Sequence, residues 1–357
     1  MWGSPPGCEA QRLPPTPSSA FRSRGLLDQG VQRGRWRPAH FEFFAAVFLI
    51  AGAGVSFAQP PQTNPDSVQL TMAPVQGNVY VLMGDGGNIT VQVGKDGVML
   101  VDTGFAPLAP KAMAEIRKLS GGPIRWIVNT HVHADHTGGN AEMAKLGMTS
   151  ESIGPPRIVA QSNVLNRMTA PPTGNQPKIP EAEWPNDEYF LPTKDFFFNG
   201  EAVVVYHVPA AHTDGDSLVF FRRSDVLSTG DVFTPGSYPI LDLARGGSVE
   251  GEIKALNQII DITVPAKYQE GGTLVIPGHG RLCDEADVVE YRNMLTVIRD
   301  RFRDMIHKGM TLEQVKAAKP TLDYDTQYGS ATGFWTTDMF VEAVYKSLSG
   351  KPVSESK

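Results

Sequence analysis

The first half of the chain alternates short runs of β-branched and apolar residues with turn-forming Gly, Asn and Asp residues, a pattern typical of antiparallel strands. The predicted strands are Val68–Met72, Val79–Met83, Ile89–Val93 and Val98–Asp102. Apolar residues then recur at helical spacing over Leu108–Leu119, and another β-rich run covers Ile124–Asn129. Strand, helix and strand in this order indicate a βαβ-like unit whose last strand ends at Thr130 and His131.

The second half has the same mixed character. The predicted strands are Arg157–Ala160, Ala202–Val208, Ser217–Arg222, Val226–Ser228 and Thr273–Ile276, and the predicted helices are Glu250–Ile260, Asp287–His307, Thr311–Ala318 and Phe334–Ser347. Residues 170–196 are rich in Pro and polar residues, which predicts a surface loop. Two similar halves of strands and helices predict an α/β protein, with sheets packed face to face and helices on the outer faces.

The N-terminus has the pattern of an export signal. Three arginines at 33, 35 and 37 precede the apolar stretch Phe43–Val55, and the small residues Ser56 and Ala58 suit a cleavage site before Gln59. About 13 apolar residues are few for a membrane span, although an uncleaved anchor stays an alternative. We therefore expect a periplasmic or secreted protein without stable membrane association after cleavage.

These boundaries predict three parts of the chain. Residues 1–58 would form a disordered extension plus signal peptide, residues 59–310 the main domain, and residues 311–357 a C-terminal helical extension packed on that domain. Removal of residues 1–58 takes away six arginines and three acidic residues, so the formal charge changes from −6 to −9. Cys8 would leave with this segment, so Cys283 would have no disulfide partner within the mature chain.

Charge also limits the partners. The whole chain has 32 Lys and Arg against 38 Asp and Glu, with no sustained basic run beyond the N-terminus. Because phosphate backbones are bound by clustered positive charge, nucleic acid is not an expected partner. A small-molecule substrate is the expected partner, and the sequence does not indicate an oligomeric state.

The most informative stretch is Thr130–Gly139, which reads THVHADHTGG. It brings His131, His133, Asp135 and His136 into six positions immediately after a predicted strand. Imidazole nitrogens and carboxylate oxygens are good ligands for a borderline cation such as zinc. Only eight histidines exist in the chain, so three within six residues predict a metal site rather than surface-loop histidines.

Three further residues occur in similar surroundings. His212 in AHTDGD, Asp231 in LSTGD and His279 in PGHG each follow a strand-like run. Four strand ends would therefore bring potential ligands to one edge of the protein.

The HxHxDH motif followed by His, Asp and His resembles the metallo-β-lactamase superfamily, in the binuclear form of glyoxalase-II-like thioesterases and lactonases. The resemblance spans about residues 68–300. It implies an αβ/βα sandwich of two mixed sheets with helices on the outer faces, and two Zn²⁺ ions as cofactors. By this analogy the first metal is held by His131, His133 and His212, the second by Asp135, His136 and His279, and Asp231 bridges them.

Three of these residue types narrow the resemblance within the superfamily. Many β-lactamases of the commonest subclass have a cysteine in place of Asp231 and an arginine in place of His136. Diiron oxygen-reducing relatives usually have a glutamate in place of His133. The ligand set thus resembles the broader binuclear hydrolases and favours zinc over a redox iron pair.

Two zinc ions would hold a bridging hydroxide for attack on a carbonyl, which predicts hydrolysis of an ester, thioester, lactone or amide, including a β-lactam. Asp135 is the expected catalytic residue, because it can ligate the second metal and also orient the nucleophile or accept its proton. Asp102, which follows a predicted strand, either holds a ligand histidine in its tautomer or only forms a turn before Gly104. Tyr238 is either a hydrogen-bond donor to an oxyanion or an ordinary loop residue.

Two other functions stay open at this point. One is a redox diiron protein, and the other is a non-catalytic periplasmic zinc-binding protein.

Overall fold

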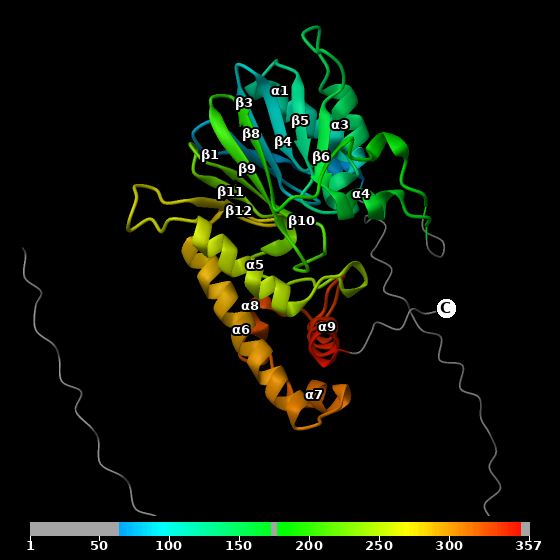
Figure 1. Cartoon of the computed structure of the whole chain (residues 1–357), viewed down its shortest axis with the longest axis vertical. Coiled ribbons are helices and arrows are strands. Elements are labelled where there is room, and N and C mark those ends of the chain that lie inside the picture. The colour runs from blue at the N-terminus through cyan, green and yellow to red at the C-terminus, as the bar shows by residue number, and fades with distance from the viewer. Residues whose placement is uncertain (1–63, 173–176, 351–357) are drawn as a thin grey trace, which may run out of the picture. The chain divides into compact units, whose positions relative to one another are not determined.

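Two β-sheets form the centre of the computed structural model, which describes residues 64–172 and 177–350 (Figure 1). The first sheet has the order β1-β2-β3-β4-β5-β6-β7, in which β1 to β4 are antiparallel and β4 to β7 parallel. Its strands are β1 (Thr71–Gln76), β2 (Val79–Met83), β3 (Ile89–Gly94), β4 (Gly97–Val101), β5 (Ile124–Val128), β6 (Arg157–Gln161) and β7 (Asp187–Tyr189).

The second sheet has the order β13-β12-β11-β10-β9-β8, and within it only β11 and β12 run parallel. Its strands are β8 (Thr193–Phe198), β9 (Glu201–Val208), β10 (Asp216–Phe221), β11 (Val226–Ser228), β12 (Leu274–Ile276) and β13 (Cys283–Asp284). The α-helices are α1 (Ala109–Leu119), α2 (Ala134–Thr137), α3 (Asn140–Leu146), α4 (Ser162–Thr169), α5 (Val249–Ile262), α6 (Glu285–His307), α7 (Leu312–Ala318), α8 (Asp325–Tyr328) and α9 (Thr337–Ser349).

Alternation of side chains along the strands places the two sheets face to face. In β4, Met99 and Val101 join a buried cluster with Val205 and Val219 of the second sheet. The intervening residues of β4 point the other way and pack against α1 and α3. On the outer face of the second sheet, a third cluster joins strand residues to α5, α6 and α9. The fold is therefore an αβ/βα sandwich of two mixed sheets with helices on the outer faces, which confirms the prediction (Figure 1).

The C-terminal helices share the core of α5 and α6. Val315 of α7 and Phe340 and Val344 of α9 are buried in the same cluster as Leu256 and Leu295. The observed packing thus places residues 312–349 against the outer helices of the second sheet, while the boundary proposed at residue 310 remains a prediction.

Two expectations about local structure were wrong. Residues 170–196 are not only a loop, because β7 and the first part of β8 lie within this range and pair with β6 and β9. β7 is three residues long, too short for a periodic apolar pattern to reveal it. The first strand begins at Thr71 instead of Val68, since its register is set by pairing with β2. The predicted export signal lies outside the described residues.

Parallel strands bring the candidate ligands to one edge of the sandwich. Asp102 follows β4 and His131 follows β5, and these two strands are parallel neighbours in the first sheet. Asp231 follows β11 and His279 follows β12, which are parallel neighbours in the second sheet. The carboxyl ends of parallel neighbours lie at the same edge, so both sheets contribute to one site there. In the described part of the chain, no helix has the length and apolar character to cross a membrane.

Glu252 of α5 is an unusual core residue. It is 0% exposed, and neither carboxyl oxygen has a hydrogen-bond partner among the described residues. Burial, with added repulsion from Asp216 and Asp231, raises the pKa of Glu252 well above its ordinary value of 4.5. The neutral acid is thus the form that this core accommodates.

We expect Glu252→Leu to stabilise the protein by about 1–3 kcal/mol at pH 8, because it removes an unpaired polar group from the core. Since the folded pKa is raised, the contribution of neutral Glu252 is complete below pH 4.5 and is lost as the pH rises toward the folded pKa. The gain from Glu252→Leu should therefore be smaller at pH 5 than at pH 8. Thermal unfolding of both proteins at the two pH values measures this gain in stability. Glu252→Gln is the control that removes only the charge. An equal gain from Glu252→Leu at pH 5 and pH 8 would contradict the raised pKa of Glu252.

Candidate metal centre

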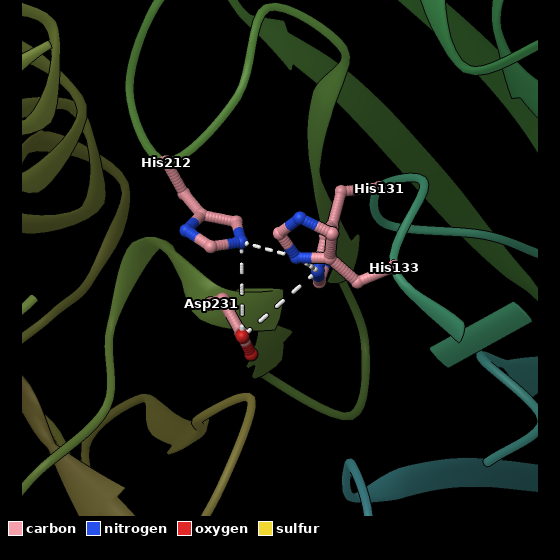
Figure 2. A group of neighbouring side chains, drawn as sticks. All are labelled: His131, His133, His212 and Asp231. Atoms are coloured by element: carbon pink, nitrogen blue, oxygen red, sulfur yellow. Dashed lines mark hydrogen bonds and ion pairs between the residues drawn. The ribbon is translucent and has the colours of Figure 1, made fainter. Parts of the chain in front are cut away.

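The HxHxDH motif occupies the turn between β5 and α2. His131 and His133 precede α2, with His133 as its N-cap residue, while Asp135 and His136 lie in its single turn. This abrupt change from strand to helix directs all four side chains toward the edge of the sandwich. His212 reaches the same region from the loop after β9, and Figure 2 shows it facing His131, His133 and Asp231.

The first group of donor atoms is compact. His133 Nδ1 lies 3.1 Å from His131 Nε2 and 2.9 Å from His212 Nε2. Asp231 Oδ2 lies 3.9 Å from His131 Nε2 and 3.8 Å from His212 Nε2. Ligand atoms on a tetrahedral zinc, at 2.0–2.2 Å from the metal, are about 3.3–3.6 Å apart. The spacing of these four side chains therefore suits one zinc ion.

The second group lies beside the first and faces the other oxygen of Asp231. Asp135 Oδ2 is 3.2 Å from His279 Nε2 and 3.7 Å from His136 Nε2, and the two imidazole nitrogens are 3.3 Å apart. Asp231 Oδ1 is 3.1 Å from His136 Nε2 and 3.4 Å from His279 Nε2. The structure thus brings all seven sequence-predicted ligands together and places the buried Asp231 between two groups. The assignment of each ligand to a metal remains a prediction.

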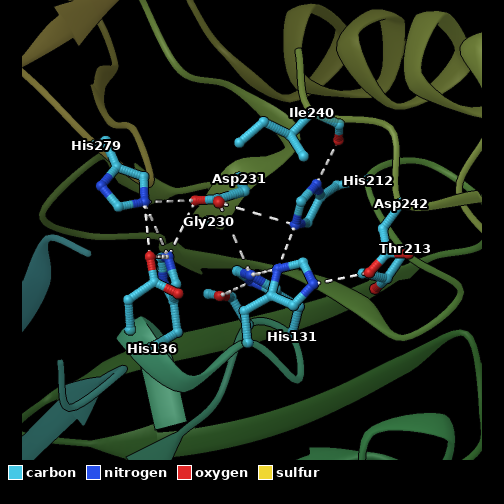
Figure 3. A network of polar contacts seen from close by, with 12 residues as sticks. His131, His136, His212, Thr213, Gly230, Asp231, Ile240, Asp242 and His279 are labelled. Atoms are coloured by element: carbon cyan, nitrogen blue, oxygen red, sulfur yellow. Dashed lines mark hydrogen bonds and ion pairs between the residues drawn. The ribbon is translucent and has the colours of Figure 1, made fainter. Parts of the chain in front are cut away.

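Partners on the outer side of four rings determine which ring nitrogen carries a proton (Figure 3). His133 Nε2 donates to Asp242, His136 Nδ1 to Asp102, and His212 Nδ1 to the Ile240 carbonyl, at 2.6–2.9 Å. The Thr130 hydroxyl donates to Asp102 Oδ2 at 2.7 Å, so it accepts from His131 Nδ1 at 3.0 Å. In the tautomers set by these contacts, the inner nitrogens of His131, His133 and His212 hold a lone pair. His136 differs, because its pKa, which burial alone would lower, is raised well above the ordinary value by Asp231, Asp135 and Asp102.

These lone pairs indicate a cation. Unprotonated nitrogens that face one another at 2.9–3.1 Å repel unless a positive charge lies between them. Asp231 Oδ1 is likewise buried and has no hydrogen bond of good geometry. A set of imidazoles and carboxylates that converge in this way suits a zinc ion at each group.

The charges around the two groups differ. At the first group, burial and nearby histidines lower the pKa of His131 well below its ordinary value and lower that of His212 to about 4. At the second group, burial alone would lower the pKa of His279, but Asp231 and Asp135 raise it to about 10. A metal at the second group must therefore displace protons, whereas His131 and His212 of the first group are neutral rings.

Asp102 combines the two roles that the sequence left open. Its backbone has a φ of 64°, a left-handed conformation that Asp adopts more readily than most residues, at the turn after β4. Its buried carboxylate accepts from the Thr130 backbone and hydroxyl and from His136 Nδ1. The strained turn thus places the carboxylate that orients His136.

Sequence reasoning missed Asp242 and the Ile240 carbonyl as supports of ligand histidines. Asp242 lies 109 positions after His133 in a short segment without a recognisable motif, so no local signal could have found it.

Tyr238 is not an oxyanion donor. It is 1% exposed, stacks on Phe340, and its hydroxyl lies 2.8 Å from Asp325 Oδ1, among the outer helices.

One side of the centre is open to solvent. The side chains of His279 and Asp135 are 32% and 27% exposed, whereas the other ligands are buried or nearly so. The loop between β2 and β3 borders this side, because Gly87 N donates to the Asp135 carbonyl and Asn88 N to the Gly278 carbonyl. The second group, with Asp135, is therefore the part of the centre that faces solvent.

Known proteins similar in sequence to this chain include, by name, a metallo-beta-lactamase and an alkylsulfatase. A curated relative, metallo-beta-lactamase IND-1 of Chryseobacterium indologenes, is 24% identical over 222 residues, which cover 62% of this chain and 81% of that protein. A linear primary-alkylsulfatase of Pseudomonas sp. (strain ATCC 19151) is 38% identical over 76 residues, and the chain spans only 14% of its length.

Solved structures show the shared fold. The sec-alkylsulfatase Pisa1 from Pseudomonas sp. matches with a TM-score of 0.59 at 18% identity, over 78% of this chain and 50% of that chain. A metallo-beta-lactamase from Pontibacter korlensis matches with a TM-score of 0.50 at 17% identity, over 64% of this chain and 99% of that one. The family model of the metallo-beta-lactamase superfamily matches residues 82–279, more than half of the chain. The chain therefore belongs to the metallo-beta-lactamase superfamily, whose members are generally hydrolases.

Proposed function

We propose that this chain is an exported, zinc-dependent hydrolase that cleaves an ester, thioester, lactone or amide bond in a small molecule. The convergence of five imidazole rings and two carboxylates into two adjacent groups carries this proposal. The arginine-rich and apolar pattern before Gln59 supports export.

Bound zinc would lower the pKa of a water molecule and polarise the bond to be cleaved. The residues of the chain hold and orient the reactants. Asp135 is partly exposed and lies next to His279, at the position where an incoming substrate would meet the nucleophile. Burial alone would raise the pKa of Asp135, but His136 and His279 lower it to about 2. Asp135 is therefore ionised at neutral pH and able to accept a hydrogen bond or a proton from the nucleophile.

A sulfate ester is a second candidate substrate class. The alkylsulfatase of Pseudomonas sp. and the sec-alkylsulfatase Pisa1 both resemble this chain, in sequence over a short segment and in fold. The metallo-beta-lactamase IND-1 supports the amide class, since its similarity extends over 81% of that protein. Both classes need a metal centre that binds an anionic or polarised oxygen, so the substrate has to be found by experiment.

The test is metal analysis of the purified chain followed by a substrate panel. We expect about two zinc ions per chain. The panel contains nitrocefin, a thioester, a lactone, an aryl ester and an alkyl sulfate. Asp135→Asn should lower turnover of the active substrate by roughly 10²–10⁴-fold, because it removes the proton-accepting carboxylate. Asp261→Asn, on the exposed side of α5, is the matched control and should leave turnover unchanged.

Other results would favour other functions. Bound iron together with dioxygen consumption would support a redox diiron protein. Zinc without turnover of any panel member, and with no effect of Asp135→Asn, would support a zinc-binding protein without catalysis. Export is tested separately: a mature N-terminus at Gln59 in the periplasm or the medium is the expected result.

A further inference from the structure

The segment Ile240–Ser248 contacts two candidate ligands that come from different sheets (Figure 3). The Ile240 carbonyl accepts from His212 Nδ1 at 2.6 Å, and Asp242 N donates to the His212 carbonyl at 3.0 Å. The Asp242 carboxylate accepts from His133 Nε2 at 2.9 Å. One short segment thus holds the outer side of both His133 and His212.

Asp242 has a fixed position within this segment. Its carboxylate caps the 3₁₀ turn Leu243–Arg245 by accepting from Arg245 N, and Arg245 Nη1 donates to Asp242 Oδ2 at 2.7 Å. Oδ2 therefore lies between the Arg245 guanidinium and the His133 ring. Asp242 is 0% exposed, so no solvent competes with these contacts. A buried carboxylate held by a guanidinium is well suited to orient a neutral imidazole.

The segment is also tied to the loop that carries His212. Ser248 N donates to the Ala211 carbonyl and Asp214 N to the Arg245 carbonyl, each at 2.9 Å. A Cβ atom on Gly247 would lie 2.2 Å from the His212 carbonyl oxygen, so only glycine allows this approach. These contacts hold the segment against the loop that carries His212.

We propose that Ile240–Ser248 is the support of the first metal position, in which Asp242 and Arg245 act as positioning residues for His133. This inference rests on the metal binding in the proposed function. The Asp242 contact fixes the proton on His133 Nε2, so only Nδ1 faces the metal. The second group depends on Asp102 instead, and among the described residues nothing donates to or accepts from His279 Nδ1. The support therefore acts on one metal position and not on the other.

The experiment is a stepwise zinc titration of the metal-free chain against a competing chelator, combined with NMR of the histidine ring nitrogens. In the wild type, His133 is recognised as the ring that coordinates zinc through Nδ1. The titration step at which its signal changes is the step in which the first metal position is filled. Asp242→Ala should weaken that step by about 10–100-fold and leave the other step unchanged. Asp242→Asn retains an oxygen that accepts from Nε2–H, so its loss should be smaller than that of Asp242→Ala.

Arg245→Met provides an independent variant and should weaken the same step by less than Asp242→Ala. Its matched control is Arg301→Met, which removes an arginine paired with Asp323 on the exposed helical side and should change neither step. Unchanged affinity in both Asp242→Ala and Arg245→Met would overturn the inference, and so would an equal loss at both steps. If Asp242→Ala does not fold, Arg245→Met decides alone. A wild-type chain that binds no zinc would instead reject the proposed function.

Discussion

Asp231→Asn is expected to leave at most one zinc per chain and to lower turnover by more than about 100-fold. Loss of a residue that only orients a metal ligand lowers activity by up to about 100-fold, and Asp231 faces both metal positions directly. Asp231 faces the first group with Oδ2 and the second group with Oδ1, and it is almost fully buried. An asparagine presents one oxygen and one NH₂ group, so one of the two positions would receive a donor in place of an acceptor. Metal content and turnover of the active panel substrate measure the effect.

Asp225→Asn is the matched control for this variant. Asp225 is also a buried aspartate near a strand end of the second sheet, but it accepts from Thr273 and does not face a ligand. We expect it to lower the stability modestly and to retain two zinc ions. Two zinc ions per chain and unchanged turnover in Asp231→Asn would show that Asp231 does not connect the two positions.

Gly278→Ala is expected to disrupt the same residue through packing alone. A Cβ atom at this position would lie 2.0 Å from Asp231 Oδ1 and 2.7 Å from the Gly230 carbonyl carbon. Because the Gly230 backbone cannot move away freely, the Asp231 side chain must shift, and with it the oxygen that faces His136 and His279. We expect loss of zinc from the second position, a fall in turnover of at least roughly 10–100-fold, and about 1–3 kcal/mol of lost stability from overpacking.

Gly121→Ala is the control for the added methyl group, since a Cβ at Gly121 meets no atom within 4 Å. It should keep the metal content, turnover and unfolding temperature of the wild type. Binding of two zinc ions with wild-type affinity by Gly278→Ala would contradict this expectation. A loss of turnover with two bound zinc ions would show that the added methyl group displaces the substrate and not Asp231.

Much of the fold could be predicted because strand and helix periods are local properties. The continuous apolar run Val98–Val101 follows from the burial of β4 between the other sheet and α1. The helical pattern predicted for Asp287–His307 is confirmed by α6. β7 escaped prediction because it is held by pairing with β6 and not by its own residues. The export signal, the periplasmic or secreted location and the absence of nucleic-acid or membrane partners remain predictions.

By itself, the sequence determined the candidate ligand residues of the site. The HxHxDH motif, together with His212, Asp231 and His279 after strand-like runs, places the ligand types at strand ends, and this follows from local pattern and chemistry. Only the tertiary structure decided which nitrogen of each ring faces inward and which side of the centre is open. The inward nitrogens of His133, His136 and His212 are set by Asp242, Asp102 and the Ile240 carbonyl, which lie 28 to 109 positions away along the chain. Contacts over such separations arise from pairing of strands within each sheet and, for Asp242 and His133, from packing of the two sheets, and no local pattern in the sequence encodes them.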